Sequence, residues 1–171
     1  MKKATILIIL LLGLAVKIQA QNNTDRDKFK FGINGGLPVG DASEIAKFSL
    51  GLDAAYHYGV SKVFDIGLAT GFTNAFLETD DLAVQSNFDN VQFLPVAGLV
   101  RVFPHVRSRL NFGADVGYAV GVSEDTDSGF YYRPIVAFNI GRGTEITGSY
   151  TGIELDGGTW STATLGVLFG F

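Results

Sequence analysis

The chain has 171 residues, no cysteine, 47% hydrophobic residues and 22 glycines. This length favours one domain, and the composition excludes both a disordered chain and a solvated helical bundle. Without cysteine the protein has no disulfide, no thiolate nucleophile and no cysteine-ligated metal.

Residues 1–20 are expected to be a signal peptide. Lys2 and Lys3 precede a largely apolar run from Ala4 to Val16, and the small residue Ala20 ends the segment. The run is too short to span a bilayer comfortably, and an uncleaved anchor is the alternative. Cleavage would remove three lysines and no acid, which leaves ten basic residues against 17 acidic ones and a net charge of −7. That charge argues against a nucleic-acid partner, because phosphate binding needs clustered lysine and arginine.

After a polar leader over 21–28, apolar residues alternate with small or polar ones almost to the end of the chain. This period of two predicts strands, and no helical period follows residue 20. Eight strands are predicted, over about 29–37, 50–60, 64–73, 90–103, 110–122, 130–140, 144–154 and 161–171.

The predicted connections alternate in length. Longer polar loops are expected over 40–48, 77–90, 123–129 and 154–158, and short turns over 61–63, 104–108 and 141–143. In a meander this order places all long loops at one end of the sheet and all short turns at the other.

An alternating strand fits a soluble barrel or sandwich with an apolar core, and it also fits a membrane barrel whose apolar face meets lipid. The size of the side chains on the polar face decides between them. That face is mainly Gly, Ala, Ser, Thr and Asn. Glycine is unfavourable in a solvent-facing strand, but an eight-stranded barrel has so little room inside that bulky inward residues need small neighbours. The pattern therefore favours the membrane barrel.

Aromatic residues support this reading because they gather near strand ends, where a membrane barrel carries two girdles. One group lies near the short turns and the other near the long loops: Phe29, Phe31, Tyr56, Tyr58, Phe64, Phe169 and Phe171, then Phe72, Phe130 and Tyr132. We expect an all-β fold, an eight-stranded antiparallel up-and-down transmembrane β-barrel over residues 29–171. It is expected in the outer membrane of a Gram-negative bacterium, with periplasmic termini and extracellular loops.

Four stretches carry a resemblance to a known family: "KFKFGINGGLPVGD", "NVQFLPVAGLVRVF", "LNFGADVGYAVG" and the terminal Phe171. The chain resembles the small outer-membrane barrels of OmpA and OmpX type, and more closely the PorT-like barrel family common in Bacteroidetes. The resemblance covers residues 29–171. It implies that the C-terminal strand, with Phe169 and Phe171, is recognised by the barrel-insertion machinery, and that outer-membrane lipid or lipopolysaccharide surrounds the barrel.

Eight ionisable residues fall on the face predicted to point inward: Lys30, Asp53, His57, Asp65, Arg101, Asp115, Arg133 and Glu145. Asp65 and Arg101 lie on adjacent strands at similar height and are predicted to pair, because buried charges need partners. The set predicts either a polar plug that ties the strands together or an ion path. The narrow lumen favours the plug.

No catalytic, cofactor-binding or metal site is predicted. Neither His57 nor His105 has a serine or an acid at an interpretable spacing for a nucleophile and base. The loops are acidic, with Glu78, Asp80, Asp81, Asp89, Glu124, Asp125 and Asp127, but they match no EF-hand pattern. The opposite rim is basic, with Lys62, Arg107, Arg109 and Arg142.

The sequence leaves three functions open. The first is a non-catalytic barrel that anchors or presents its loops for binding, or that supports membrane integrity. The second is a narrow, porin-like path for small solutes, and the third is a lipid-modifying enzyme.

Overall fold

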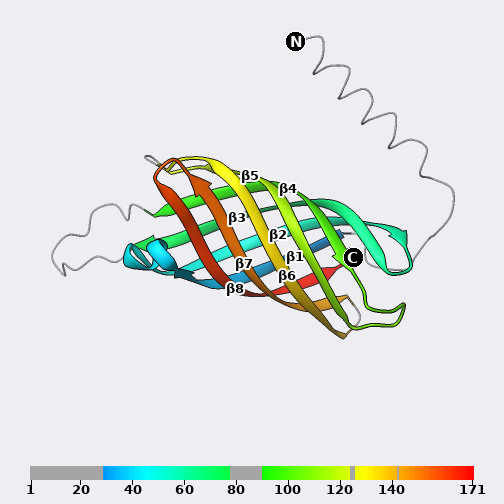
Figure 1. The fold of residues 1–171 in the computed structure, drawn as a ribbon. Helices are drawn as coiled ribbons and strands as arrows, with labels where there is room; N and C mark the ends of the chain where they lie inside the picture. Colours follow the sequence, from blue (N-terminus) through cyan, green and yellow to red (C-terminus); the bar gives the residue numbers. More distant parts are fainter. Residues whose placement is uncertain (1–28, 78–89, 124–125, 142) are drawn as a thin grey trace, which may run out of the picture.

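The computed structural model describes residues 29–77, 90–123, 126–141 and 143–171. Eight strands form a closed barrel in which each strand pairs antiparallel with its neighbours in the chain, and β1 pairs with β8 to close it (Figure 1). The strands are β1 Phe29–Val39, β2 Ala46–Ser61, β3 Phe64–Leu77, β4 Val91–Val102, β5 Leu110–Gly121, β6 Gly129–Gly141, β7 Thr144–Leu155 and β8 Gly158–Gly170. The predicted fold is confirmed. Over the described residues, no helix is both long enough and apolar enough to cross a membrane.

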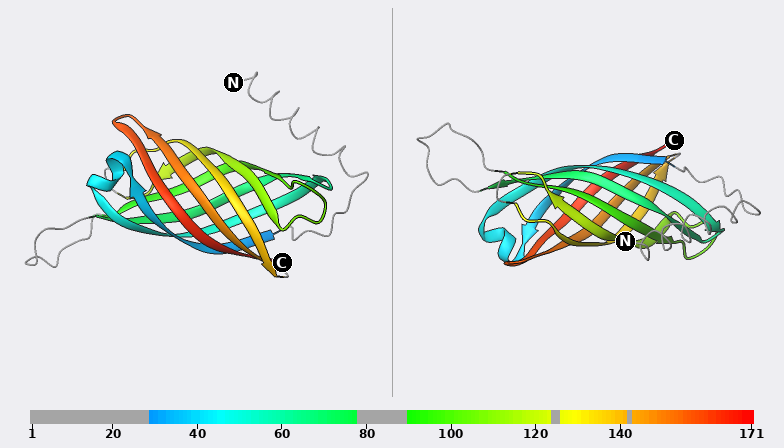
Figure 2. Two further views of the ribbon diagram at one scale, coloured as in Figure 1. Left: turned by 60° about the horizontal axis from the view of Figure 1, so that its bottom comes forward. Right: turned by 90° about the horizontal axis from the view of Figure 1, so that it is seen from above.

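The two ends of the barrel differ. A short 3₁₀ helix, η1 (Gly40–Glu44), joins β1 to β2 at one end, and the C-terminus lies at the other (Figure 2). The connections β2–β3, β4–β5 and β6–β7 lie at the C-terminal end. We call these the η1 end and the C-terminal end.

The predicted alternation in connection length is wrong in two places. The expected loop over 154–158 is a two-residue turn, because Leu155 pairs with Gly158 around Asp156 and Gly157. Asp-Gly is a strong two-residue hairpin signal, and Gly158 has a φ of 146° that other residues rarely adopt. The expected loop over 40–48 is also shorter, since β2 begins at Ala46. The turn between Val102 and Leu110, at the opposite end, is longer than either.

Burial is inverted relative to a soluble protein. On β5, the apolar side chains of Phe112, Val116 and Tyr118 are 44–52% exposed, whereas Asp115 and Ala119 are fully buried. The same inversion recurs around the barrel, where most strand leucines, isoleucines and valines are exposed and charged residues are buried. A water-soluble barrel would expose the charges and bury the aliphatic side chains.

Inward-facing glycines let the strands approach closely. A Cβ atom built on Gly67 would lie 1.8 Å from the Tyr56 carbonyl oxygen, and one on Gly113 would lie 2.1 Å from the Val100 carbonyl oxygen. No side chain fits at either position without moving the backbone. This explains why the polar face of the strands is rich in glycine.

Candidate functional site

All eight ionisable residues predicted to face inward do so, and each is at most 8% exposed. They come from seven different strands, so their side chains meet across the lumen. The eight side chains form two groups of polar contacts, and an apolar cluster lies between these groups and the η1 end.

The central group, which we call the interior charge network, contains Asp53, Arg101, Asp115 and Arg133. The Arg133 guanidinium bridges the lumen, with Nη1 at 2.7 Å from Asp53 Oδ1 on β2 and Nη2 at 2.8 Å from Asp115 Oδ2 on β5. Its Nε donates to Asp115 Oδ2 as well, at 3.0 Å. Asp53 Oδ2 also accepts a hydrogen bond from Asn34 Nδ2 at 2.8 Å. Two cations and two anions balance, as buried charges require.

Asp65 and Arg101 face each other in register, as predicted. An ion pair that the sequence did not predict joins Arg101 Nη1 to Asp115 Oδ1, at 2.7 Å. The reason lies on the other neighbouring strand, where Gly113 is opposite Arg101. The Arg101 Cδ atom lies 2.6 Å from the place a Gly113 Cβ would occupy, so the arginine crosses β5 through the space the glycine leaves.

A second group lies nearer the C-terminal end. Lys30 Nζ on β1 donates to Glu145 Oε2 on β7 at 2.8 Å, and Asn111 Nδ2 on β5 donates to the same oxygen at 3.3 Å. His57 and Asp65 are buried beside each other, with 3.9 Å between Nδ1 and Oδ2. Neither ring nitrogen of His57 has a hydrogen-bond partner within the described part of the chain.

Towards η1 the lumen contains a cluster of apolar side chains that the sequence did not predict, beside buried polar residues such as Ser49 and Thr162. Phe93, Tyr131, Ile153 and Trp160 form a buried cluster, with the Phe93 and Trp160 ring centroids 5.8 Å apart. Ala42 of η1 is 2% exposed and packs on the same cluster. We call these five residues the apolar plug. The sequence of β4 indicates such a cluster, because both faces of this strand carry mainly apolar residues.

The network and the plug leave little space between them. The cavity bordered by Asp53 and Arg133 on one side and Phe93 and Trp160 on the other is about 20 Å³. That volume accommodates about one water molecule. Between the network and the plug, the lumen is therefore packed with charged side chains and rings.

The two ends carry opposite charges. Exposed acids predominate at the η1 end (Asp41, Glu44, Asp127, Glu154 and Asp156), where Lys47 is also exposed, while Lys62, Arg107 and Arg109 are exposed at the C-terminal end. The predicted loop acids Glu78, Asp80, Asp81, Asp89, Glu124 and Asp125, and the basic Arg142, lie outside the described residues. Among the residues described, no three His, Asp or Glu side chains are grouped to hold a metal ion.

The C-terminal residues face outward. Phe169 is 46% exposed, and Phe171 is 80% exposed with its backbone N–H bonded to the Phe29 carbonyl oxygen at 2.9 Å. The last strand thus ends on the outer wall, against the first.

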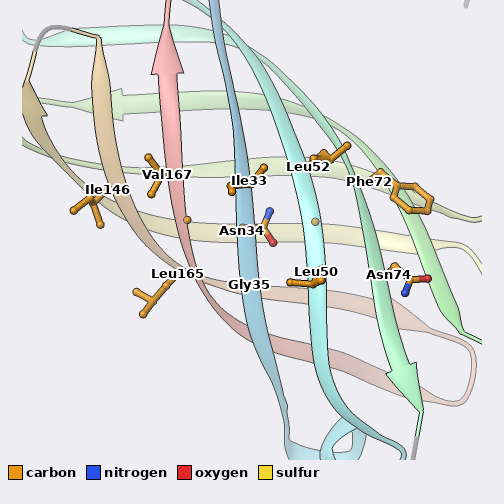
Figure 3. A pocket seen from close by; sticks show the side chains of 12 residues that line it. Ile33, Asn34, Gly35, Leu50, Leu52, Phe72, Asn74, Ile146, Leu165 and Val167 are labelled. Carbon is orange, nitrogen blue, oxygen red and sulfur yellow. The ribbon is translucent and has the colours of Figure 1, made fainter.

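The outer wall is hollowed over β8, β1 and β2. A groove of about 680 Å³ is lined by apolar side chains that include Ile33, Leu50, Leu52, Leu165 and Val167, with Gly35 between them (Figure 3).

Comparison with solved structures finds the same fold in outer-membrane proteins. The outer membrane protein Ail of Yersinia pestis, solved in a phospholipid bilayer nanodisc, superposes with a TM-score of 0.59 and 16% identity, over 85% of this chain and 100% of that one. A crystal structure of Ail with the heparin analogue sucrose octasulfate gives a TM-score of 0.58, over 85% of this chain and 97% of that one.

A de novo designed transmembrane β-barrel has the same architecture, with a TM-score of 0.53 and 11% identity, over 86% of this chain and 98% of that one. No protein-family model matches the chain, and no curated protein matches it. The comparisons therefore establish the fold.

Proposed function

We propose that this protein is an outer-membrane barrel that does not conduct and does not catalyse, and that anchors an acidic surface outside the cell. Its strands of 11–16 residues are long enough to cross a bilayer, which takes about 9–11 residues when tilted. Closure pairs every strand with two neighbours, so no backbone edge is left unpaired in lipid. The inverted burial carries the proposal, since the apolar outer wall has no stable place in water.

The packed lumen favours an anchor over a pore. Arg133 ties β6 to β2 and β5, and Arg101 ties β4 to β5, so the charges join strands on different sides of the barrel. A solute crossing the lumen would have to break these ion pairs and also displace the apolar plug. Opening the centre means exposing unpaired buried charges, which costs several kcal/mol per ion.

In this proposal the η1 end is extracellular and the C-terminal end periplasmic. The connections 40–45, 78–90, 122–128 and 156–157 each contain acids and no lysine or arginine. Ail has been solved with a heparin analogue, which is a polyanion. This acidic surface would repel such a ligand, so a cationic partner fits the loops better.

Further parts of the proposal are the PorT-like family membership, cleavage after residue 20, and recognition of Phe169 and Phe171 by the barrel-insertion machinery. The exposed aromatic end of β8 beside β1 leaves those rings accessible at the rim.

The proposed location is tested by membrane fractionation, followed by electrophoresis with and without boiling. A folded barrel is expected in the outer-membrane fraction, and it should migrate differently from its boiled form. Recovery of the protein as a soluble periplasmic species would contradict the proposal.

The proposed lack of conduction is tested in planar bilayers. The wild-type barrel is expected to show no steady conductance, whereas a pore would conduct, and neutralising Arg101 would then change its conductance. Lipid-modification assays with the folded barrel test the enzymatic alternative, for which the expected result is unchanged lipid.

A further inference from the structure

Two turns at the C-terminal end carry basic residues and no acid. The β2–β3 turn contributes Lys62, and the longer β4–β5 turn over 103–109 contributes Arg107 and Arg109, all with exposed side chains. We call these three residues the basic rim. Its positive charge contrasts with the net charge of −4 of the whole chain. The terminal carboxylate of Phe171 lies at the same end but on the opposite side of the barrel, because β8 is four strands away from β4.

Backbone hydrogen bonds hold the two turns together. The Phe103 N–H donates to the Val63 carbonyl oxygen at 2.9 Å, which joins the β4–β5 turn to the β2–β3 turn beside Lys62. The Asn139 N–H donates to the Arg109 carbonyl oxygen at 2.8 Å, which joins the same turn to β6. The backbone of the basic rim is therefore ordered before any ligand binds, and this lowers the entropy cost of binding.

The tip of the β4–β5 turn presents an apolar side chain next to a charged one. The Ser108 N–H donates to the His105 carbonyl oxygen at 2.9 Å, and this bond closes a β-turn with Val106 and Arg107 at its centre. Ser108 Oγ also accepts from the Leu110 N–H at 3.1 Å. Val106 is 60% exposed. A valine beside an arginine suits the boundary between hydrocarbon and water, where an arginine reaches outward from an apolar surface.

The register of the strands gives the depth of the basic rim. Val102, the last residue of β4, pairs with Phe64 on β3 and with Phe112 on β5, so two outward rings mark this level of the wall. Aromatic rings of this kind lie at the membrane–water interface. Lys62 precedes Phe64 by two residues, and Arg109 precedes Phe112 by three. At about 3.3 Å per residue, the basic side chains start about 7–10 Å from the rings, which is the depth of lipid headgroups.

We infer that the basic rim binds the phosphate groups of anionic phospholipids and prefers them to zwitterionic ones. The inference rests on the proposed membrane location. That location alone requires an apolar wall but no preference for a headgroup charge. Arginine donates to phosphate through its planar fork, and a zwitterionic headgroup offsets its own phosphate with an ammonium group. An acidic protein is the other class of partner that the charge would suit, but the adjacent rings and Val106 place the rim beside lipid.

The inference is tested by replacing phosphatidylcholine stepwise with phosphatidylglycerol around the full-length barrel in nanodiscs. NMR follows the Nε–Hε signals of Arg107 and Arg109 and the amide signal of Val106. We expect saturable shifts of these signals. In the double variant Arg107→Gln with Arg109→Gln, followed at Val106, half-saturation should need about fivefold more phosphatidylglycerol. This corresponds to ~1 kcal/mol, within the range for exposed charges near an anionic surface.

Two control variants separate charge from structure. The double variant Arg107→Lys with Arg109→Lys keeps both charges and should stay within about twofold of wild type. Lys47→Gln removes an exposed basic residue near the η1 end and should leave half-saturation unchanged. All variants are first shown to be folded by the gel shift without boiling.

Equal half-saturation in wild type and the double glutamine variant would overturn the inference. The same shifts with inorganic phosphate in pure phosphatidylcholine nanodiscs would also overturn it, because the rim would then bind free anions. Shifts with polyglutamate but none with phosphatidylglycerol would assign the rim to an acidic protein instead. A barrel that fractionates with the outer membrane and shows no lipid preference would refute this inference alone, whereas a soluble periplasmic protein would refute the proposed function.

Discussion

Arg133→Met is the substitution that tests the interior charge network most sharply. It removes three charge-assisted hydrogen bonds, one to Asp53 and two to Asp115. At about 1.5–3 kcal/mol each, these would sum to about 5–9 kcal/mol. We expect the smaller loss of about 3–5 kcal/mol that is typical of breaking a buried ion pair. The loss is smaller because Asp53 keeps its hydrogen bond from Asn34 and Asp115 keeps its ion pair with Arg101.

The loss should be partly recovered by removing the anion that Arg133 leaves behind. In Arg133→Met with Asp53→Asn, the remaining Asp115–Arg101 pair is still balanced. We therefore expect the double variant to be less destabilised than the sum of the single variants, by about 1–3 kcal/mol. Arg107→Met, in the exposed β4–β5 turn, is the control and should change stability by no more than about 0.5 kcal/mol.

The assay is urea unfolding in lipid vesicles, with the folded fraction read from unboiled gels. If Arg133→Met costs less than about 1 kcal/mol, the upper value for an exposed pair, or if the two substitutions are simply additive, then Arg133 does not hold the two carboxylates as a buried ion pair.

Two further substitutions probe the interior. Gly113→Ala should cost about 1–3 kcal/mol in the same assay, because its Cβ would meet the Val100 carbonyl oxygen and the Arg101 side chain. The control Gly98→Ala should be close to neutral, and equal effects of the two substitutions would contradict the close approach of β4 and β5. Trp160→Ala should cost about 3–5 kcal/mol by opening a cavity in the apolar plug, and unchanged stability would show that the ring is not packed there. The fluorescence of Trp160, the chain's one tryptophan, should resist acrylamide in the folded barrel and lose that protection on unfolding; equal quenching in both states would argue against a closed lumen.

The sequence predicted the barrel and the inward orientation of the eight ionisable residues, because both follow from a period of two. Each strand has one face inside the barrel. Once the glycine-rich face was assigned to the inside, Asp115 and Arg133, which lie on that face, were predicted to point into the lumen. The signal was strong since inward glycines such as Gly113 have a steric reason to be there.

The ion pair between Arg101 and Asp115 could not be predicted from position along the strand. Arg101 has Asp65 opposite it on one side and Gly113 on the other, and the missing side chain of the glycine directs the arginine to Asp115. Predicting this requires the three-dimensional path of a long side chain as well as the register.

The apolar plug was missed for a different reason. Inward rings such as Phe93 and Trp160 interrupt the alternation of apolar and polar residues that identified the other strands. A segment with two apolar faces can mean a buried strand of any kind. Only the closed barrel shows that the second face of β4 fills the lumen.

Leu68→Arg tests whether the exposed aliphatic wall of this barrel contacts hydrocarbon. Leu68 lies in β3, is 67% exposed, and is outside the groove. The free energy of unfolding is measured for wild type and variant in lipid vesicles. A loss of about 2–4 kcal/mol is expected, which is the cost of an arginine facing the middle of a bilayer. A change within about 0.5 kcal/mol, as for a water-exposed surface residue, would show that this wall does not face hydrocarbon.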